Sequence, residues 1–594
     1  MDLRALEAPP SDEERAAVDA VLGATEPEAT TPLAVARSRR HLLLPALHAA
    51  QGRVGWVSPG ALGYICRRLA VPPAEGFGVA SFYALFALAE RPPVALHVCD
   101  DIACKMAGAD AIVAGLAGEQ RVHRSPCLGL CEQAPAALYT RAGERPVERG
   151  LGQLTLARAS DLLARGEPGH DSHAALPQAG EPGLRLLARV GVVDPSSLDD
   201  YRARGGYRAL RLALEMGPLE VIRALTESGL VGRGGAAFPT GKKWDAVAHA
   251  PARPHYVVCN ADESEPGTFK DRVLMEQDPF ALVEAMTIAG VTVGAERGYL
   301  YVRAEYPLAA ERLQRAIDLS RARGLLGDDV LGRGVRFELE IRRGAGAYIC
   351  GEETALFNSL EGFRGEPRSK PPFPVEVGLF GKPTVVNNVE TLVNVPFIVE
   401  HGAAAYRSAG TAGSPGTRLF CVSGRVEKPG LYELPFGVTL SALLERAGGV
   451  AAGKALGGIL LGGAAGSFVG KESLELPLTF EDTRRAGVTL GSGVVLVLDD
   501  SVDLGPLLLR IAAFFREESC GQCVPCRVGT VRQEELVTRL VKKQPQGGLD
   551  AELALLGELG QAMRDASICG LGQTASSAIE SAVQRLGALR GGRP

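Results

Sequence analysis

Four cysteines near the carboxyl end of the chain have the types and spacing of metal ligands. Cys520, Cys523 and Cys526 stand within seven residues of one another, and Cys569 follows at a distance. Four thiolates in such an arrangement hold a cubane-type iron–sulfur cluster, whose potential the protein tunes through hydrogen bonds and burial. A structural zinc site is the alternative, although zinc sites usually have two separated pairs of cysteines. Electron transfer is therefore the first chemistry that the sequence indicates.

A second set of four cysteines lies in the first quarter of the chain. Four residues separate Cys99 from Cys104, and three separate Cys127 from Cys131. Two such pairs, one near the end of an expected strand and one in a loop, fit a two-iron cluster. Zinc is again the alternative. Because the chain shows no signal-peptide pattern, we expect a cytoplasmic, reducing compartment, in which cysteines ligate metals or cofactors more readily than they form disulfides.

Between the two cysteine sets, a glycine-rich loop and three further segments have the composition of a cofactor site. The loop at 232–244 lets backbone N–H groups approach a phosphate, and a following helix adds favourable partial charge. It matches neither the Walker nor the G-x-G-x-x-G pattern, and a structural turn is the alternative. The acidic segment 259–272 follows an expected strand, where open α/β sheets bind ligands; a solvated loop is the alternative. Segments 344–356 and 370–391 are compatible with packed turns.

The composition limits the class of protein. The 594 residues suggest about four domains. A hydrophobic content of 46% and a charged content of 22% are ordinary for a folded chain, and a net charge of −5 argues against nucleic-acid binding. The most apolar stretches, 457–469 and 494–498, are short or rich in glycine, so we expect no membrane insertion.

Apolar periodicity and turn formers predict the elements of the first third. We expect a helical region over 1–90 and a buried strand at 94–99, followed by alternating strands and helices within 91–165. Residues 166–184 lack periodicity and carry turn formers, which predicts a linker.

The remaining two thirds divide into three expected units. Over 185–410, strands such as 256–259 alternate with helices such as 308–323, which predicts an α/β domain. Residues 411–503 contain short strand-like runs around one helix, which predicts a small α+β domain. Residues 504–594 are expected to be helical, with the carboxyl-terminal cysteines at the first break.

Taken in order, the four central segments and the carboxyl-terminal cysteines resemble the flavin-containing NADH-oxidising subunits of respiratory NADH dehydrogenase. That family has relatives in NAD-dependent formate dehydrogenases and NAD-reducing hydrogenases. The resemblance covers about residues 185–594. The first 165 residues resemble the thioredoxin-like partner subunit of that enzyme, fused here to the same chain. The layout is similar to the diaphorase subunit of NAD-reducing hydrogenase or the beta subunit of NAD-dependent formate dehydrogenase.

This resemblance implies a multidomain α/β fold. It comprises a helical region with a thioredoxin-like [2Fe-2S] ferredoxin domain, then a Rossmann-like FMN- and NAD-binding domain over 185–410. A ubiquitin-like β-grasp domain over 411–503 and a helical bundle with a [4Fe-4S] cluster over 504–594 would follow.

The resemblance also implies the site residues. FMN would be held by Gly232, Arg233, Gly234, Gly235, Lys243, Asn260, Asp262, Glu263, Ser264, Tyr348, Gly351, Glu352, Asn387, Asn388 and Thr391. NAD would be faced by Phe238, Glu265, Glu353 and Phe373, of which the two aromatic residues would stack on its rings. Cys520, Cys523, Cys526 and Cys569 would ligate the [4Fe-4S] cluster, and Cys99, Cys104, Cys127 and Cys131 the [2Fe-2S] cluster.

Two further expectations concern single residues. Ala237 stands where the family usually has Gly, so the loop there must accommodate a Cβ atom. Four cysteines outside both sets are expected to be packed thiols: Cys66, Cys259, Cys350 and Cys421.

The implied activity is that of an NAD-dependent FMN and iron–sulfur oxidoreductase of the diaphorase type. FMN carries out the hydride transfer, so no side chain is expected to act as a general base, and Glu265 and Glu353 only shape the site. We expect NAD rather than NADP, because acidic residues crowd the expected ribose site. The expected partners are other iron–sulfur subunits and a catalytic subunit of formate dehydrogenase or hydrogenase type, in a hetero-oligomer.

Two alternatives remain at this point. The chain can be a fused flavoprotein subunit of an NADH dehydrogenase that reduces quinone. From a different class, it can be a non-catalytic scaffold subunit that binds zinc in place of the clusters.

Overall fold

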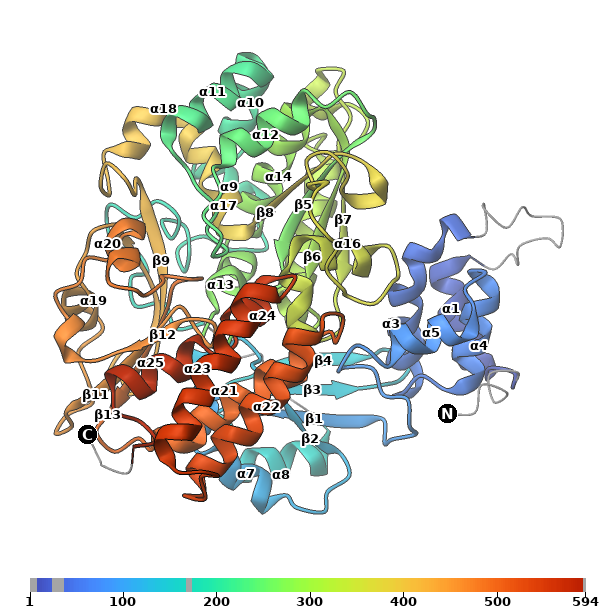
Figure 1. The fold of residues 1–594 in the computed structure, drawn as a ribbon. Coiled ribbons are helices and arrows are strands. Elements are labelled where there is room, and N and C mark those ends of the chain that lie inside the picture. Colours follow the sequence, from blue (N-terminus) through green and yellow to red (C-terminus); the bar gives the residue numbers. More distant parts are fainter. Residues whose placement is uncertain (1–7, 24–36, 167–173, 591–594) are drawn as a thin grey trace.

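The computed structural model describes residues 8–23, 37–166 and 174–590. Figure 1 shows the N-terminal helices in blue at one side, with the first sheet beside them and the carboxyl-terminal helices in red at the front. Parts of the expected N-terminal helical region (1–7 and 24–36), of the expected linker (167–173) and of the carboxyl terminus (591–594) lie outside the described residues. In the described part of 1–90, the prediction of helices is confirmed.

The N-terminal region consists of short capped helices. Ser58 accepts a hydrogen bond from the Ala61 amide and Pro59 takes the first helical position, two signals that begin a helix. Ser11 forms a capping box with Glu14 at the start of the first helix. The elements are α1 (Asp12–Leu22), η2 (Arg40–Leu42), α3 (Leu43–Val54), α4 (Pro59–Arg68) and α5 (Pro73–Ala80).

The first sheet has the strand order β2-β1-β3-β4, in which β1 is parallel to β2 and antiparallel to β3. The strand predicted at 94–99 is confirmed as β1. Cys99, its last residue, lies opposite Ser125 at the end of β2. The elements are β1 (Val94–Cys99), α6 (Ile102–Met106), α7 (Ala109–Gly115), β2 (Val122–Ser125), η3 (Cys131–Gln133), β3 (Ala137–Arg141), β4 (Val147–Leu151) and α8 (Leu156–Arg165).

The second sheet is wholly parallel, with the order β7-β6-β5-β8. Asn260, near the end of β5, lies opposite Asn388, the last residue of β8, so both asparagines stand at the carboxyl edge. The strands are β5 (His255–Ala261), β6 (Ala295–Val302), β7 (Glu338–Arg343) and β8 (Thr384–Asn388). This edge is where open α/β sheets bind ligands.

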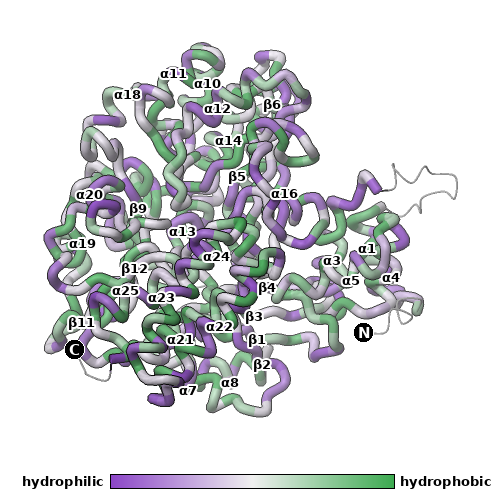
Figure 2. Tube along the Cα trace, viewed as in Figure 1, coloured by the Kyte–Doolittle hydropathy of each residue, from purple (hydrophilic) through white to green (hydrophobic). Residues whose placement is uncertain are grey.

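Helices cover this parallel sheet on both sides. The long helix α14 is almost wholly buried, and its mainly apolar sequence appears mostly green in Figure 2. The helices are α9 (Leu198–Ala203), α10 (Arg208–Met216), α11 (Pro218–Ser228), α12 (Thr240–Ala248), α13 (Lys270–Gln277), α14 (Pro279–Val293), α15 (Pro307–Ala322), η5 (Tyr348–Gly351), α16 (Glu353–Leu360), α17 (Val389–Val393) and α18 (Val395–Arg407). The predicted alternation of strands and helices is confirmed.

The third sheet is mixed, with the order β10-β9-β13-β11-β12 and an apolar core of its own. The described part of the expected linker, 174–184, has no helix or strand, but it is not free. The buried Gln178 side chain accepts a hydrogen bond from the Glu433 amide at 2.6 Å. The elements are β9 (Thr417–Gly424), β10 (Gly430–Pro435), α19 (Leu440–Arg446), β11 (Leu456–Leu461), β12 (Ser467–Val469), α20 (Phe480–Arg485) and β13 (Val494–Asp499).

The carboxyl-terminal part is helical, as predicted, and joins the other regions. Arg510 on α21 lies 3.5 Å from Asp100 and 3.6 Å from Asp101, beside α6 of the first sheet. The helices are α21 (Leu504–Glu518), α22 (Val524–Val541), α23 (Leu549–Ala566), α24 (Gly570–Thr574) and α25 (Ser577–Arg585). None of the helices in the described part of the chain combines the length and apolar character that a membrane crossing needs.

The four cysteines outside both sets are buried, as predicted: Cys66, Cys259, Cys350 and Cys421.

Candidate functional site

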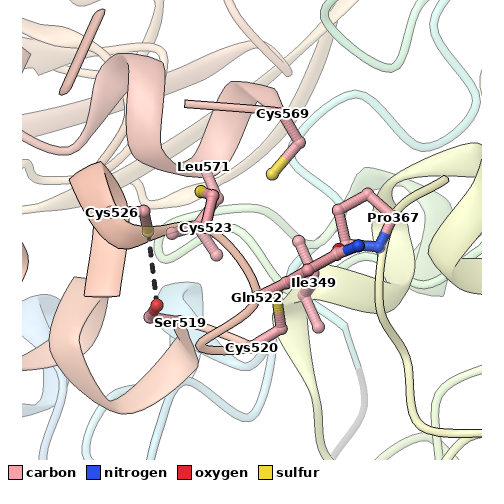
Figure 3. A pocket seen from close by; sticks show the side chains of 9 residues that line it. All are labelled: Ile349, Pro367, Ser519, Cys520, Gln522, Cys523, Cys526, Cys569 and Leu571. Carbon is pink, nitrogen blue, oxygen red and sulfur yellow. Dashed lines mark hydrogen bonds between the residues drawn. The ribbon is translucent and has the colours of Figure 1, made fainter. Parts of the chain in front are cut away.

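The four carboxyl-terminal cysteines line one cavity at the break between α21 and α22 (Figure 3). Cys520 and Cys523 lie between the two helices, Cys526 lies in the first turn of α22, and Cys569 directly precedes α24. The Ser519 hydroxyl lies 3.3 Å from the Cys526 sulfur, within hydrogen-bonding distance. The fold thus brings together the thiols that the spacing grouped.

The surroundings of these thiols fit an iron–sulfur cluster. Ile349, Pro367 and Leu571 line the cavity beside the cysteines and give it an apolar surface. Within the described ranges, no group of three or more His, Cys, Asp or Glu side chains is arranged for a single metal ion. Four thiols around an apolar cavity are the donor set of a cubane-type cluster.

The four N-terminal cysteines converge as well. Each is at most 5% exposed. Cys127 Sγ lies 3.4 Å from Cys131 Sγ, and Cys99 is within hydrogen-bonding reach of Cys104 and Cys127. The parallel pairing of β1 with β2 places the two halves of the set side by side. Four buried thiols so close together fit a two-iron cluster.

The glycine-rich loop is a closed turn before α12. The Gly232 amide donates to the Phe238 carbonyl at 2.9 Å. Gly235 has a φ of 118° and Ala237 a φ of 52°, both in the left-handed region. A Cβ atom is disfavoured in that region, which is why glycine suits position 237. The loop nevertheless accommodates the Ala237 side chain, at the cost of backbone strain.

Arg233 contributes its backbone and its side chain in different directions. The Arg233 amide donates to Thr391 Oγ1 at 2.8 Å, which ties the loop to α17. Its side chain is 1% exposed and donates to the Tyr406 hydroxyl and the Pro415 carbonyl, under the third sheet. Only the backbone of Arg233 therefore remains at the glycine-rich loop, and its side chain points away from it.

Two polar side chains at the carboxyl edge of the parallel sheet have unused hydrogen-bonding atoms. Asp262 Oδ2 and Ser264 Oγ are buried and lie near each other, and neither makes a regular hydrogen bond to any other group among the described residues. Asn260 Nδ2 donates to the Gly351 carbonyl at 2.8 Å, which joins this edge to η5. Buried polar groups need partners, so these atoms fit a cofactor rich in hydroxyl and ring heteroatoms, as FMN is.

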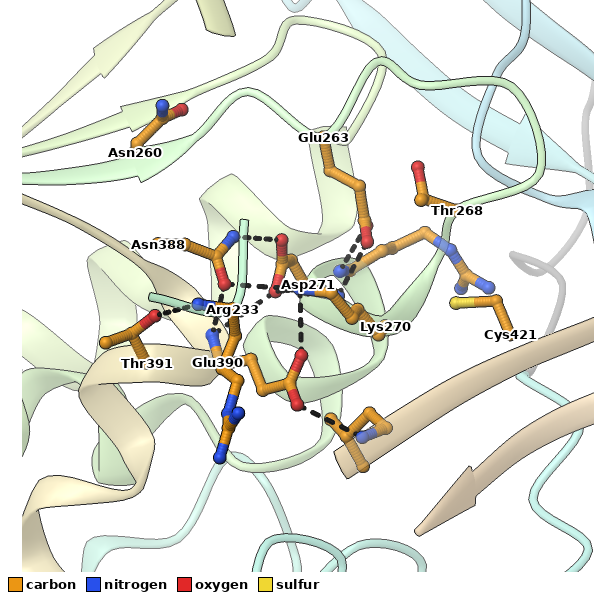
Figure 4. Close-up of polar contacts among 12 residues, drawn as sticks. Arg233, Asn260, Glu263, Thr268, Lys270, Asp271, Asn388, Glu390, Thr391 and Cys421 are labelled. Atoms are coloured by element: carbon orange, nitrogen blue, oxygen red, sulfur yellow. Dashed lines mark hydrogen bonds and ion pairs between the residues drawn. The ribbon is translucent and has the colours of Figure 1, made fainter. Parts of the chain in front are cut away.

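Asn388 belongs to a buried network around Lys270 (Figure 4). Asn388 Nδ2 donates to Asp271 at 2.6 Å, and Asn388 Oδ1 accepts from Lys270 at 3.2 Å and from the Glu390 amide at 3.0 Å. A Cβ atom on Gly234 would lie 3.2 Å from Asn388 Cβ, so the glycine allows the loop to approach. The network therefore sets the position of Asn388 beneath the loop.

Glu263 is also held by the protein. Its carboxylate accepts the amides of Asp271 and Arg272, both at 3.0 Å, and the Tyr306 hydroxyl at 3.1 Å. The carboxylate caps the start of α13 in this way, and its role toward FMN stays a prediction.

The expected dinucleotide side of the site carries alternating charges. Glu353 lies 3.4 Å from Lys243 and 2.9 Å from Lys370, and these cations lower its pKa against the effect of burial. Lys243 also donates to the Val386 carbonyl at 3.0 Å. Glu352 caps α16 and pairs with Lys370. The two glutamates and two lysines form one cluster at the edge of the sheet.

Two exposed aromatic side chains are available on the same side. Phe238 and Phe373 are each 52% exposed, which is unusual for phenylalanine. Lys243 Nζ lies 5.8 Å from the Phe238 ring centroid. Trp244 is fully buried and donates to Asn387 Oδ1 at 2.8 Å, so it fixes α12 to the end of β8. The exposed rings suit stacking on a flat ligand.

Glu265 and Tyr348 lie between the two cysteine sets. The Tyr348 hydroxyl donates to Glu265 at 2.6 Å, and the Ala465 amide donates to the same carboxylate at 2.8 Å. Tyr348 lines a cavity together with Cys127, and its neighbour Ile349 lines the cavity of the four carboxyl-terminal cysteines. Burial raises the pKa of Glu265 to about 7. This pair marks the centre of the candidate site.

Sequence reasoning missed several residues of the site. Lys270, inside the acidic segment, is 1% exposed, Arg303 is 3% exposed and binds that segment from outside it, and Lys370 pairs with two predicted glutamates. The only signal for Lys270 was the charged run at 270–272, and such runs usually mark a solvated face. Lys370 stood inside a segment already singled out, before two prolines.

Four protein families match consecutive parts of the chain. The thioredoxin-like [2Fe-2S] ferredoxin family matches residues 30–149, and the Nuo51 FMN-binding domain matches residues 225–397. The SLBB domain matches residues 419–464, and the NADH-ubiquinone oxidoreductase-F iron-sulfur binding region matches residues 506–588. These ranges contain both cysteine sets and the segments around the glycine-rich loop.

Two proteins of known name and one crystal structure are similar to this chain over most of its length. An NADH-quinone oxidoreductase subunit of Rhizobium meliloti (strain 1021) is 46% identical over 401 residues, 67% of this chain and 94% of that protein. The NADP-reducing hydrogenase subunit HndC of Solidesulfovibrio fructosivorans is 44% identical over 404 residues, 67% of this chain and 81% of that protein. A crystal structure of NAD+-reducing [NiFe]-hydrogenase in the air-oxidized state matches with a TM-score of 0.79 and 33% identity, over 92% of both chains.

Proposed function

The chain belongs to the family of its NADH-quinone oxidoreductase relatives, and from this membership we propose that it exchanges hydride with NAD(H) through FMN and single electrons with two iron–sulfur clusters. It is an oxidoreductase with FMN-binding, [4Fe-4S] and [2Fe-2S] domains. Binding of NAD(H) is part of the proposal. The observation that carries it is that Tyr348, hydrogen-bonded to Glu265, lines a cavity with Cys127, while its neighbour Ile349 lines the cavity of the four carboxyl-terminal cysteines.

In this proposal the chain's own residues bind and orient the cofactors. FMN, when bound, supplies the conversion of a two-electron hydride into single electrons. The amides of the glycine-rich loop face its phosphate, and the buried side-chain oxygens of Asp262 and Ser264 supply further hydrogen-bonding atoms. Phe238 and Phe373 stack on the dinucleotide, and Glu353 orients it with Lys243.

The cysteines divide into two ligand sets. Cys520, Cys523, Cys526 and Cys569 hold the [4Fe-4S] cluster, and Cys99, Cys104, Cys127 and Cys131 hold the [2Fe-2S] cluster. The apolar cavity around the first set and the burial of the second support these roles.

The domain boundaries expected from the sequence are proposed unchanged. The SLBB match and the mixed sheet support a ubiquitin-like β-grasp domain over 411–503. The parallel sheet supports a Rossmann-like domain over 185–410.

Relatives of this chain are subunits of larger complexes, so the chain works in a hetero-oligomer. We propose the diaphorase position, next to a hydrogenase or formate dehydrogenase catalytic subunit. The match over 92% of a chain from an NAD+-reducing hydrogenase, which includes the fused N-terminal part, favours the hydrogenase type. A fused flavoprotein subunit of a quinone-reducing NADH dehydrogenase is the second candidate, supported by the Rhizobium meliloti relative.

The experiment is a cofactor and activity assay of the purified full chain. We expect flavin, iron and acid-labile sulfide, and reduction of artificial dyes by NADH with a higher kcat/KM than by NADPH. The double variant Lys243→Ala/Glu353→Ala should lose most of this activity, whereas the exposed neighbour variant Lys242→Ala should keep it. Zinc without iron or flavin would instead support the scaffold alternative, and unchanged activity of the double variant would contradict the site.

A further inference from the structure

Two loops that are far apart in the sequence meet in the interior. One is the cluster loop, residues 127–131, which carries two of the N-terminal cysteines. The other is the acidic segment, 259–272, at the carboxyl edge of the parallel sheet. A small cavity lies at their junction, and Cys127, Ser264 and Arg303 are among the residues that line it.

Arg303 joins the two loops directly. It follows β6 and is 3% exposed. One terminal nitrogen donates to the Glu263 carbonyl at 2.5 Å, and the other donates to the Cys127 carbonyl at 2.6 Å. The second nitrogen also pairs with Glu305 at 2.8 Å. A planar guanidinium with a rigid fork of donors suits such a double contact, which a lysine ammonium on a flexible stem does not reproduce.

Other residues of the domain over 185–410, called here the flavin domain, also bind the cluster loop. Arg272 Nε donates to the Gly129 carbonyl at 2.8 Å, and its guanidinium pairs with Glu132. The Gly267 amide lies within hydrogen-bonding reach of the Cys127 sulfur. The cluster loop is therefore bound by cations and amides that belong to another domain.

The charge of Arg303 bears on the redox chemistry of this loop. The potential of an iron–sulfur cluster depends on net charge, hydrogen bonds and solvent exposure. Reduction adds one negative charge, and a buried cation nearby stabilises the reduced form more strongly than a solvated one would. Glu305 is 9% exposed and partly cancels that charge.

We propose that Arg303 is a positioning residue through which the flavin domain raises the reduction potential of the [2Fe-2S] cluster, while it holds the Glu263 carbonyl of the acidic segment. This rests on the proposed function, in particular on Cys127 as a ligand. The cluster then behaves as a part of the flavin site and not as an independent ferredoxin.

The test is an electron paramagnetic resonance redox titration of the [2Fe-2S] signal in the purified full chain. Arg303→Met should lower the ratio of reduced to oxidised cluster at a given potential at least tenfold, which is about 59 mV for a one-electron couple. Glu305→Gln keeps Arg303 and removes its counter-charge, so it should shift the potential in the opposite direction. Arg121→Met is the control. It removes a cation of the domain that carries the cluster, where Arg121 bonds to Glu119 and Leu163, and it should leave the potential unchanged.

The outcomes separate this inference from the proposed function. Absence of a [2Fe-2S] signal in the wild-type protein would contradict the ligand assignment. A normal wild-type signal, with Arg303→Met and Glu305→Gln both at the wild-type potential, would overturn the role of Arg303. If Arg303→Met fails to assemble the cluster, Glu305→Gln decides alone, and an unchanged or lowered potential in that variant rejects the proposal.

Discussion

Glu263 and Glu265 are two residues apart, yet their carboxylates have different neighbours. Glu263 accepts two amides at the start of α13, so it acts as a helix cap. Glu265 accepts the Tyr348 hydroxyl and one amide in a half-buried position, where loss of solvation raises its pKa to about 7. Residue type alone does not distinguish these two roles, because the role depends on which groups the fold brings to each oxygen.

At the same scale, the exposed Phe238 ring tests the dinucleotide side of the site. We expect Phe238→Ala to raise the KM for NADH about fivefold, with kcat nearly unchanged, because loss of an aromatic stacking contact costs about 1 kcal/mol. Steady-state kinetics with an artificial dye measure both constants.

Phe363→Ala is the matched control, because Phe363 is 41% exposed and lies outside the proposed site. An equal KM effect in both variants, or no effect in Phe238→Ala, would remove Phe238 from the binding site.

At the scale of elements, the cluster loop depends on a glycine. Gly129 has a φ of 65°, and a Cβ atom there would lie 2.0 Å from the Tyr306 hydroxyl. We expect Gly129→Ala to lose most of the [2Fe-2S] cluster, because the loop would have to move away from the flavin domain. Iron content and the intensity of the [2Fe-2S] signal measure the loss.

Gly118→Ala separates backbone strain from this clash. Gly118 lies in the same domain with a φ of 88°, but a Cβ atom there meets nothing within 4 Å. Both variants bear the cost of a left-handed alanine, about 1–2 kcal/mol. Equal cluster content in the two variants would show that contact with Tyr306 is unimportant.

At the scale of the whole molecule, a half-buried histidine joins the N-terminal helices to the parallel-sheet domain. His48 on α3 shares a hydrogen bond of 2.8 Å with the Gly344 carbonyl of the parallel-sheet domain. Burial, with a smaller effect of the Arg343 charge, lowers the pKa of His48 to about 3. The folded protein therefore keeps the ring neutral at moderately acidic pH.

This interface should lose stability in acid. In the unfolded chain this histidine binds a proton below its usual pKa of about 6.5, whereas the folded ring stays neutral. The free energy of unfolding is therefore highest above that pH and falls as the pH drops below it. Between pH 8 and pH 5.5 the loss is about 1.4 kcal/mol. We expect the Tm of wild type to fall more over this range than the Tm of His48→Gln, measured by thermal unfolding.

His249→Gln is the control for this prediction, because the His249 side chain is 64% exposed. Its Tm should follow wild type at both pH values. If His48→Gln also follows wild type, the His48 ring does not contribute to the acid sensitivity.

Much of the fold followed from local patterns. Apolar runs and helical periodicity located β1, β5 and α15, because a short apolar run between turn formers predicts a buried strand and a longer periodic segment predicts a helix. The described residues of the expected linker were harder. They form turns as predicted, but Gln178 is buried against β10, and such a contact is invisible in a local pattern.

The candidate site was predictable where residue type and spacing carry the chemistry. The two cysteine sets converge, and the residues named around the glycine-rich loop gather at the carboxyl edge of the parallel sheet. Lys270 and Arg303 were not predictable, because a buried cation is identified by its partners. Those partners, Glu390 and Cys127, are more than a hundred residues away along the chain.

By itself, the sequence determined the kinds of chemistry available to this protein, through its eight cysteines in two sets and its glycine-rich and acidic segments. Only the tertiary structure decided which of these groups face one another. It turned the Arg233 side chain away from the loop, used Glu263 as a cap and bound the cluster loop to Arg303. The physical reason is that spacing along the chain sets local geometry, whereas burial and ion pairing depend on segments that meet only after folding.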